Sequence, residues 1–265
     1  MIRLGIAGAC GRMGQRIAAL AAADPESFTI TGALEKDNSK WCGADYARFL
    51  GLSADRVHVK VESDATAVID KVDVLVDFAV GDDVLTHVNL ARQKKVKMVI
   101  GTTGLNKSGV TQINEAAREI PIVMDSNMSP GLNIILTFLP KFIKSLGSGY
   151  DIDIIDTHHR SKKDWPSGTA LRLADVLAKA ANRKIKSDGQ PRTGSEVVIH
   201  SVRGGDVVGD HTLIFARQGE RIEITHRASS RDIFAFGALW AAKFVARANA
   251  GKCYKMLDAM RGYPG

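Results

Sequence analysis

Residues 2–14, IRLGIAGACGRMG, decide the fold. Residues 2–7, apolar except for Arg3, predict a short buried strand, and residues 15–23, rich in Ala, Ile and Leu, predict a helix. Between them, glycines at positions 8, 11 and 14 form a G-x-x-G-x-x-G run. Glycines at such a turn let the backbone approach a pyrophosphate, whose charge lies at the helix N-terminus. A plain strand-to-helix turn explains the run equally well, so the glycines alone do not decide between the two.

An acidic residue at the right distance favours dinucleotide binding. Glu35 follows a second predicted strand, 28–34, and lies 21 positions after Gly14. The dinucleotide fingerprint places an acid about 20 residues on, where it hydrogen-bonds the adenosine ribose. A carboxylate favours NAD, whereas a neighbouring cation such as Lys36 favours the 2′-phosphate of NADP. We therefore expect NADH or NADPH as cofactor with weak discrimination, although a solvated surface lysine is an equal interpretation of Lys36.

The first half of the chain alternates strands with helices. Further strands are predicted at 57–61, 73–78, 97–100 and 122–124, and helices at 83–93 and 107–119. This repetition is typical of a parallel sheet covered on both faces, that is, a Rossmann-like α/β domain. Ligands bind such sheets outside the carboxyl ends of the strands. The polar segments 101–104 and 125–127 follow two strands and are therefore placed to line a cofactor cleft, although each alone reads as a turn.

The second half has a different order of predicted helices and strands. Helices are predicted at 132–146, 167–182 and 232–248, and strands at 150–156, 196–202, 212–216 and 221–225, the last two at hairpin spacing. Strands grouped between helices favour an α+β domain built on a mixed sheet. We expect a dinucleotide-binding domain at 1–127, joined by the C-terminal segment 238–265. A substrate-binding and oligomerisation domain would span 128–237, since Pro130 and Gly131 interrupt the pattern near the boundary.

Charge is unevenly divided between the halves. The 265 residues carry a formal net charge of +7; residues 1–127 hold 15 basic and 16 acidic side chains, and residues 128–265 hold 21 and 13. A basic half suits nucleic acid, a membrane surface or acidic small molecules. No recognised nucleic-acid module is present, and the uncharged stretch 126–140 is shorter than the ~20 apolar residues of a membrane span. Three scattered cysteines suit a reducing cytoplasm rather than a disulfide framework.

The densest chemistry lies in residues 156–170, DTHHRSKKDWPSGTA. A metal site is one interpretation, but adjacent histidines on a strand point to opposite faces and no Cys or further His lies at ligand spacing. A basic loop that is solvated or binds nucleic acid is another. The third is an anion-binding catalytic loop, in which a histidine moves protons and Ser167 caps a helix whose N–H groups hold a carboxylate. With a nicotinamide site upstream, the third is preferred.

These residues together resemble the dihydrodipicolinate reductase family of lysine and diaminopimelate biosynthesis over nearly the whole chain. The match is carried by residues 8–14, Glu35, 77–78, 101–104, 126–129, Gly131, Asn133, 158–160, Lys162, Asp164 and 166–170. Downstream it continues at Arg203, Gly205, Gly209, His211, Phe215, Glu220, His226, 230–231 and Phe234. Lys163 and Trp165 stand where the family commonly has smaller or apolar residues. The segment at 158–170 is the specific part of the resemblance.

The resemblance implies an NAD(P)H-dependent oxidoreductase that reduces 4-hydroxy-tetrahydrodipicolinate to tetrahydrodipicolinate with loss of water. His158 would be the acid/base residue and Lys162 the proton donor, while His159, Gly168 and Thr169 would bind the dicarboxylate substrate. The expected cofactor contacts are Gly8, Ala9, Cys10, Gly11, Arg12, Met13, Glu35, Lys36, Gly101, Thr102, Thr103, Asp125, Ser126, Asn127 and Met128. A homotetramer is implied, with no metal, nucleic acid or membrane partner. Closure of the two domains would exclude water from the reaction.

Two rival functions are weighed against this one. Another nicotinamide dehydrogenase, acting on an amino acid or semialdehyde, would share the first domain but lack the segment at 158–170. A dinucleotide-sensing regulator would bind nucleic acid through the basic half, yet the sequence contains neither a helix-turn-helix pattern nor a basic helix.

Overall fold

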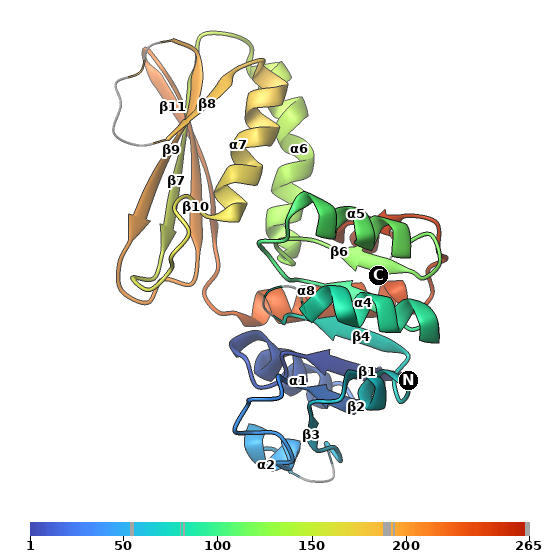
Figure 1. Cartoon of the computed structure of the whole chain (residues 1–265). Helices are drawn as coiled ribbons and strands as arrows, with labels where there is room; N and C mark the ends of the chain where they lie inside the picture. Colours follow the sequence, from blue (N-terminus) through green and yellow to red (C-terminus); the bar gives the residue numbers. More distant parts are fainter. Residues whose placement is uncertain (54–55, 80, 82, 188–191, 193, 263–265) are drawn as a thin grey trace. The chain divides into compact units, whose positions relative to one another are not determined.

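The computed structural model divides the chain into two compact units (Figure 1). Unit 1 comprises Met1–Pro130 and Asp232–Gly265, and unit 2 comprises Gly131–Arg231. The structure describes all residues except 54–55, 80, 82, 188–191, 193 and 263–265. The boundaries expected from sequence, 127/128 and 237/238, differ from these by a few residues, because the whole helix that begins at Asp232 lies within unit 1.

Unit 1 contains a seven-stranded sheet and its helices. The strands are β1 (Ile2–Ala7), β2 (Phe28–Leu34), β3 (Val61–Glu62), β4 (Val74–Asp77), β5 (Lys97–Ile100), β6 (Ile122–Met124) and β12 (Cys253–Tyr254). The helices are α1 (Arg12–Ala23), α2 (Tyr46–Leu50), α3 (Ala65–Ile69), α4 (Asp83–Lys94), α5 (Lys107–Ala116), α8 (Asp232–Val245) and α9 (Met256–Arg261). The order across the sheet is β12-β6-β5-β4-β1-β2-β3, and every pairing is parallel. The predicted Rossmann-like sheet is confirmed.

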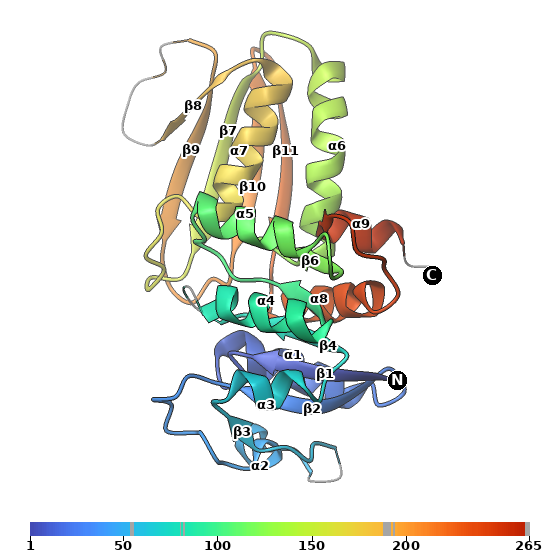
Figure 2. The ribbon, with the colours of Figure 1, turned by 45° about the vertical axis from the view of Figure 1, so that its right-hand side comes forward.

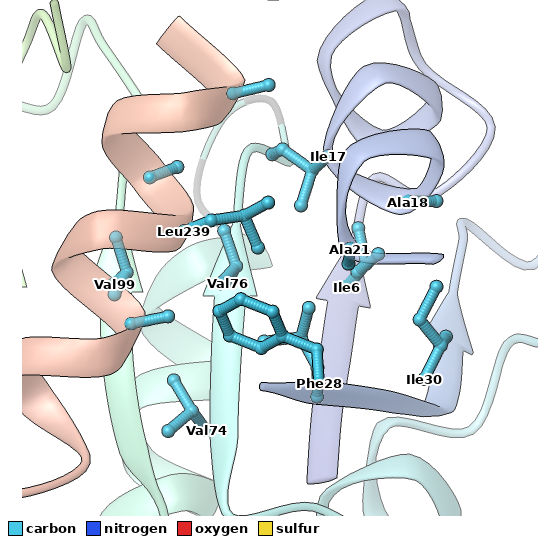
Figure 3. Close-up of a cluster of buried hydrophobic side chains, with 14 of the residues drawn as sticks. Ile6, Ile17, Ala18, Ala21, Phe28, Ile30, Val74, Val76, Val99 and Leu239 are labelled. Carbon is cyan, nitrogen blue, oxygen red and sulfur yellow. The ribbon is translucent and has the colours of Figure 1, made fainter. Parts of the chain in front are cut away.

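Alternating side chains of the strands pack on the two faces of this sheet. On one face, Leu4, Ile6 and Val76 contact apolar residues of α1 and α8; Figure 3 shows Ile17, Ala21 and Leu239 in this cluster. On the other face, Leu75, Met98 and Ile122 pack against α3, α4 and α5. Burial on both faces explains why the strands read as continuous apolar runs rather than as alternating ones.

The C-terminal part of the chain completes unit 1. Helix α8 packs beside α1, and Arg16 Nη2 donates to Asp232 Oδ2 at 2.8 Å. Strand β12 then adds to the sheet edge beside β6. Both β12 and α9 are short elements that the sequence pattern did not predict, as are α2, α3 and β8.

Unit 2 is built on a five-stranded sheet with two helices. Its helices are α6 (Pro130–Leu146), which begins at the last residue of unit 1, and α7 (Gly168–Ala181). Its strands are β7 (Asp151–His158), β8 (Lys184–Ser187), β9 (Glu196–Arg203), β10 (Asp210–Arg217) and β11 (Glu220–Arg227), in the order β11-β10-β7-β9-β8. Strand β10 is antiparallel to both β7 and β11, whereas β7, β9 and β8 run parallel. The expected α+β unit on a mixed sheet is confirmed, including the 217–220 hairpin.

Helices α6 and α7 lie along one side of this sheet, as the two views in Figures 1 and 2 show. Leu139, Leu173 and Leu177 of the helices pack against Ile152, Ile154 and Phe215 of the strands. The even-numbered residues of β7 face this core because side chains alternate along a strand. Asp156 and His158 therefore point to the buried side, in register with the core residues that precede them.

One predicted strand is wrong. Residues 57–61 were expected to form a strand, but only Val61 and Glu62 join the sheet, as β3. The backbone of this segment bonds instead to the loop before α2 and to the first residue of that helix: Val61 N donates to Ala44 O and Tyr46 N donates to Val59 O, both at 2.9 Å. The apolar alternation at 57–61 therefore reflects packing against a loop rather than a strand of the sheet.

In the described part of the chain, none of the helices combines the length and the apolar character that a membrane crossing requires.

Candidate active site

The glycine loop of unit 1 has the geometry of a phosphate cradle. Gly8 has a φ of +72°, in the left-handed region that favours glycine. A Cβ on Gly14 would lie 2.2 Å from Gly8 O and 2.6 Å from Ala9 O, so only glycine lets α1 start this close to the loop. The helix begins at Arg12, and its first N–H groups therefore face the loop with the positive end of the helix dipole.

Side chains from elsewhere in unit 1 hold this loop in place. Cys10 N donates to Glu35 Oε2 at 2.9 Å, and the Tyr46 hydroxyl donates to Ala9 O at 2.8 Å. Burial, with the nearby Glu35 carboxylate, raises the pKa of the Cys10 thiol to about 12, so the thiol stays protonated. Glu35, expected to bind a ribose, is therefore also part of the loop's own hydrogen bonding.

A cavity of about 410 Å³ opens beside the loop, and its lining residues decide whether a dinucleotide fits. Gly8, Gly11, Glu35, Lys36 and Asp83 are among its lining residues. A glycine turn and a carboxylate in one lining match what a pyrophosphate and an adenosine ribose require. Lys36 Nζ lies 3.2 Å from Asp83 Oδ2, so the cation expected near a 2′-phosphate is already paired with a carboxylate. The residues present fit the nucleotide.

The other expected cofactor residues lie at the carboxyl ends of β5 and β6. Gly101 packs on the Phe78 ring, which a Cβ would meet at 2.2 Å, and Thr102 Oγ1 donates to Ala79 O. Thr103 and Ser126 are exposed, whereas Met128 is buried in the core. Asp125 Oδ2 accepts from Met256 N at 3.2 Å, so this carboxylate also holds the start of α9.

Sequence reasoning assigned no role to the Asp77–His87 pair in unit 1. His87 Nδ1 lies 2.7 Å from Asp77 Oδ2, and Ala79 N donates to Asp77 Oδ1 at 2.9 Å. Both side chains are buried, and His87 also lines the cavity beside the glycine loop. The pair fixes the turn after β4, against which Gly8 and Thr102 pack. The sequence signal for this pair is an acid at the end of a predicted strand, followed ten residues later by a histidine in the next predicted helix.

In unit 2, the predicted catalytic segment begins on the last residues of β7. Asp156 and His158 both lie on the buried face of the sheet, and β7 ends at His158. His158 Nδ1 is 3.0 Å from Asp156 Oδ1, within ion-pair distance, although the ring N–H is not aligned well enough for a hydrogen bond. A Cβ on Gly209 would lie 2.9 Å from His158 Nε2, so this glycine leaves the space that the imidazole occupies.

A second histidine faces the same carboxylate. His211 stands opposite Asp156 in the β7–β10 register, and its Nε2 is 3.3 Å from Asp156 Oδ1. Burial lowers the pKa of His211 below its ordinary value despite the opposing effect of Asp156. Burial by itself would raise the pKa of Asp156, but His158, His211 and Ser167 together hold it well below its usual range. The carboxylate is therefore ionised and the buried His211 ring favours its neutral form.

Asp156, His158 and His211 offer ligand atoms within 4.8 Å of one another, a set that has the composition of a metal site. Arg203 Nη2 also donates to Asp156, at 3.0 Å, so a cation there would meet a guanidinium charge. The expectation that the segment binds no metal stays a prediction. Sequence reasoning missed His211 as a partner because the antiparallel register, rather than spacing along the chain, brings it to Asp156.

The residues that follow β7 form a turn. Lys162 Nζ lies 2.8 Å from Asp164 Oδ1, and His159 Nδ1 lies 2.8 Å from Ser161 Oγ. Although burial opposes the shift, the Lys162 ammonium lowers the pKa of Asp164. Lys163 points outward and is exposed. The basic run thus separates into one lysine held by a carboxylate and one solvated lysine.

Arg203, at the end of β9, ties this loop to the sheet. Its guanidinium donates to Asp164 O at 2.7 Å and to the backbone oxygen of Asp156 at 3.0 Å. The same guanidinium lies 4.9 Å from the centre of the Trp165 ring. Trp165, where this sequence departs from the family pattern, therefore covers the arginine in a cation–π contact.

The loop ends at α7, whose start is capped as predicted. Ser167 is the N-cap, and its hydroxyl accepts from Ala170 N at 3.1 Å. Ser167 N also donates to Asp156 Oδ2 at 2.8 Å. Gly168 and Thr169 form the first positions of a 14-residue helix, where N–H groups favour an anion. His158 and the α7 start are thus joined through one buried carboxylate.

The fold and these two sets of residues define a class: a nicotinamide-dependent oxidoreductase with a Rossmann-like unit and an α+β unit. Two family models match the chain, described as dihydrodipicolinate reductase N-terminus, at residues 2–128, and C-terminus, at residues 131–260. The chain therefore belongs to the dihydrodipicolinate reductase family.

Individual relatives agree with this membership. The 4-hydroxy-tetrahydrodipicolinate reductase of Nitrosomonas eutropha is 40% identical over 98% of both chains. That of Cupriavidus metallidurans is 41% identical over 98% of this chain and 99% of its own. A dipicolinate-bound dihydrodipicolinate reductase structure from Paenisporosarcina sp. TG-14 aligns with a TM-score of 0.73 at 24% identity, covering 96% of this chain and 97% of that one. This last likeness shows that the fold is shared.

Proposed function

We propose that His158 and Lys162 carry the chemistry of this chain's reaction, with His159, Gly168 and Thr169 binding the substrate. The chain is an NAD(P)H-dependent oxidoreductase that reduces 4-hydroxy-tetrahydrodipicolinate in lysine and diaminopimelate biosynthesis. The observation that carries the residue roles is the joining of His158 to the capped α7 start through Asp156. A proton-transferring group and an anion-binding helix start are thereby fixed to each other.

The substrate is a dianion, and unit 2 offers it positive charge and N–H donors. The N-terminus of α7 at Gly168 and Thr169 suits one carboxylate, because the positive end of the helix dipole favours an anion there. His159 lies on the same loop and supplies a ring nitrogen as a further contact. A carboxylate bound at the helix start would place the substrate ring beside the loop that holds Lys162.

Two proton movements accompany the reduction. The unit 1 residues from Gly8 to Met13, Glu35, Lys36, 101–103 and 125–128 would hold the nucleotide, whose nicotinamide would supply a hydride to the substrate ring. Lys162 then gives a proton to the ring nitrogen as electron density arrives there. His158, whose Nδ1 lies 3.0 Å from the Asp156 carboxylate, would take the ring C–H proton that is lost on elimination and give it to the departing hydroxide, so that one water leaves.

A matched pair of lysine variants tests these roles. In Lys162→Ala, we expect kcat to fall by about 10²–10³-fold with NADH affinity retained, because a general acid contributes that much. The control is Lys163→Ala, which removes an exposed neighbouring charge and should change kcat by less than about twofold. The measurement is steady-state oxidation of NADH with freshly made substrate. Equal loss in both variants, or near wild-type turnover in Lys162→Ala, would remove Lys162 from the mechanism.

We also propose that the chain assembles as a homotetramer and acts in the cytoplasm. Ile134, Phe138 and Leu171 of α6 and α7 are large apolar residues with 55%, 38% and 46% of their surface exposed, which favours burial against another subunit. The thiols of Cys10, Cys42 and Cys253 are free, as suits a reducing compartment. Light scattering of the purified chain, whose mass is 28.6 kDa, tests assembly. A monomeric mass at working concentration would contradict it.

A further inference from the structure

We propose that Asp156 is a positioning residue that fixes His158 and the substrate-binding start of α7 at the same time. The inference rests on the proposed function, since it assigns Asp156 to the reaction through the groups proposed above. It starts from how many elements converge on this side chain, which is fully buried at the end of β7.

The two carboxylate oxygens of Asp156 serve different partners. Oδ1 accepts from Ser167 Oγ at 2.7 Å and lies near His158 Nδ1 and His211 Nε2, at 3.0 and 3.3 Å. Oδ2 accepts from Ser167 N at 2.8 Å and from Arg203 Nη2 at 3.0 Å. The partners come from β7, β9, β10 and the cap of α7, so one carboxylate joins four segments of unit 2.

The charge balance keeps this arrangement rigid. Arg203 is nearly as buried as Asp156, with 6% of its side chain exposed, and the pair brings one negative and one positive charge into the interior. A buried charge left without its partner is costly, which favours a single arrangement of the surrounding side chains. The His158 ring has Asp156 Oδ1 3.0 Å from its Nδ1 and Gly209 beside its Nε2, which leaves little freedom for the imidazole.

The link from Asp156 to the substrate runs through Ser167. The Ser167 hydroxyl donates to Asp156 and accepts from Ala170 N, so the carboxylate orients the cap that starts α7. Gly168 and Thr169 follow directly. Loss of the Asp156 charge should therefore lower kcat, through His158, and raise the KM for the dicarboxylate, through the helix start. A residue with a purely structural role would not affect these two constants by separate routes.

Strand β7 supplies a matched control. Asp153 lies on the opposite face of the same strand and makes the same kinds of contact, with Arg192 Nη2 at 2.6 Å and His200 Nε2 at 2.9 Å. Among the residues that the structure describes, its carboxylate contacts Arg192 and His200 and neither His158 nor Ser167. Asp153→Asn thus removes a carboxylate from an Asp–His–Arg cluster of β7 without touching the proposed site.

The experiment compares Asp156→Asn, Ser167→Ala, the double variant and Asp153→Asn in the full chain, with NADH affinity measured by fluorescence. For Asp156→Asn we expect kcat to fall about 10²-fold and the KM for the dicarboxylate to rise about tenfold, with NADH affinity unchanged. Ser167→Ala should raise KM by about five- to tenfold while kcat stays within about threefold. In the double variant, KM should be no higher than in Asp156→Asn, because both act through the same cap.

Several outcomes would overturn the proposal. One is kinetics of Asp156→Asn within about threefold of wild type, and another is an equal loss in Asp153→Asn. If Asp156→Asn fails to fold, Ser167→Ala decides: a raised KM with kept kcat supports the link, and unchanged kinetics contradict it. Calorimetry with dipicolinate separates this proposal from the function itself. Wild type that binds dipicolinate but oxidises no cofactor would refute the function alone, whereas normal turnover in Asp156→Asn would refute the positioning role alone.

Discussion

The glycine loop of unit 1 and the 156–170 segment of unit 2 are both turns before a helix to which we assign anion binding, but they are built differently. The first is shaped by backbone: Gly8 adopts a positive φ, and Gly14 lets α1 approach within a distance that no Cβ permits. The second is shaped by side chains that converge on Asp156. A backbone cradle recognises a pyrophosphate common to many enzymes, whereas a side-chain network defines one particular substrate and its chemistry.

The largest effect is expected where backbone alone sets the geometry. In Gly14→Ala the new Cβ would meet Gly8 O at 2.2 Å, so we expect a loss of about 2–3 kcal/mol in stability and loss of NADH binding. Gly109→Ala in α5 is the control, because its Cβ would have ordinary contact at 3.5 Å and a helical alanine stabilises. Thermal unfolding and NADH titration measure both. A fully stable, cofactor-binding Gly14→Ala protein would refute the backbone account.

A glycine in unit 2 should act through a side chain instead. In Gly209→Ala the Cβ would lie 2.9 Å from His158 Nε2 and displace the ring, so we expect kcat to fall about 10- to 100-fold with NADH affinity kept. Gly204→Ala, where a Cβ meets nothing within 4 Å, should leave kcat unchanged. Steady-state kinetics distinguish the two. Equal kcat values in both variants would show that the His158 position is not set by this contact.

The side-chain network should also make stability depend on pH. The pKa of His211 and that of His226 are lowered, chiefly by burial, so below about pH 6.5 the unfolded chain binds more protons than the folded one. Stability therefore falls as pH falls through this range. The depressed pKa of Asp156 adds a further loss below about pH 4. Urea unfolding across pH measures this; His211→Asn should flatten the upper part, and a wild-type curve flat between about pH 7 and 5 would contradict it.

The smallest effect concerns cofactor choice in unit 1. Lys36 is paired with Asp83 at 3.2 Å, and both side chains are about half exposed. Asp83→Asn should free Lys36 for a 2′-phosphate and raise kcat/KM for NADPH by about three- to fivefold relative to NADH, while Lys36→Ala should lower it similarly. Kinetics with both cofactors measure the ratio. If neither variant moves the ratio, Lys36 is a solvated lysine.

The sequence predicts the glycine loop of unit 1 better than the Asp156 network of unit 2, because the signals for the first are local in the chain. The glycine run, Glu35 and the strand–helix alternation are local signals, and the parallel sheet they predicted is the one observed. Ser167 as the cap of α7 was equally local. Short elements such as β12 and α9 were missed because two or six residues carry no periodicity, and 57–61 was misassigned because its partners lie in a loop.

The network around Asp156 was beyond sequence reasoning because its members meet only through strand register. His211 and Arg203 lie on β10 and β9, opposite Asp156 and His158, and the chain distance between them carries no sign of contact. Gly209 belongs to the family pattern, but its role depends on the 2.9 Å that would separate an added Cβ from His158 Nε2, a distance that the sequence does not show. The sequence alone assigns no function to Asp156, the first residue of the 156–170 segment.

The most direct test of the account is the reaction itself. The purified chain is mixed with freshly made 4-hydroxy-tetrahydrodipicolinate, and oxidation of NADH and of NADPH is followed by absorbance in wild type and in Lys162→Ala. We expect substrate-dependent oxidation by wild type and its near-complete loss in Lys162→Ala, with NADH still bound. No oxidation of either cofactor by wild type would contradict it.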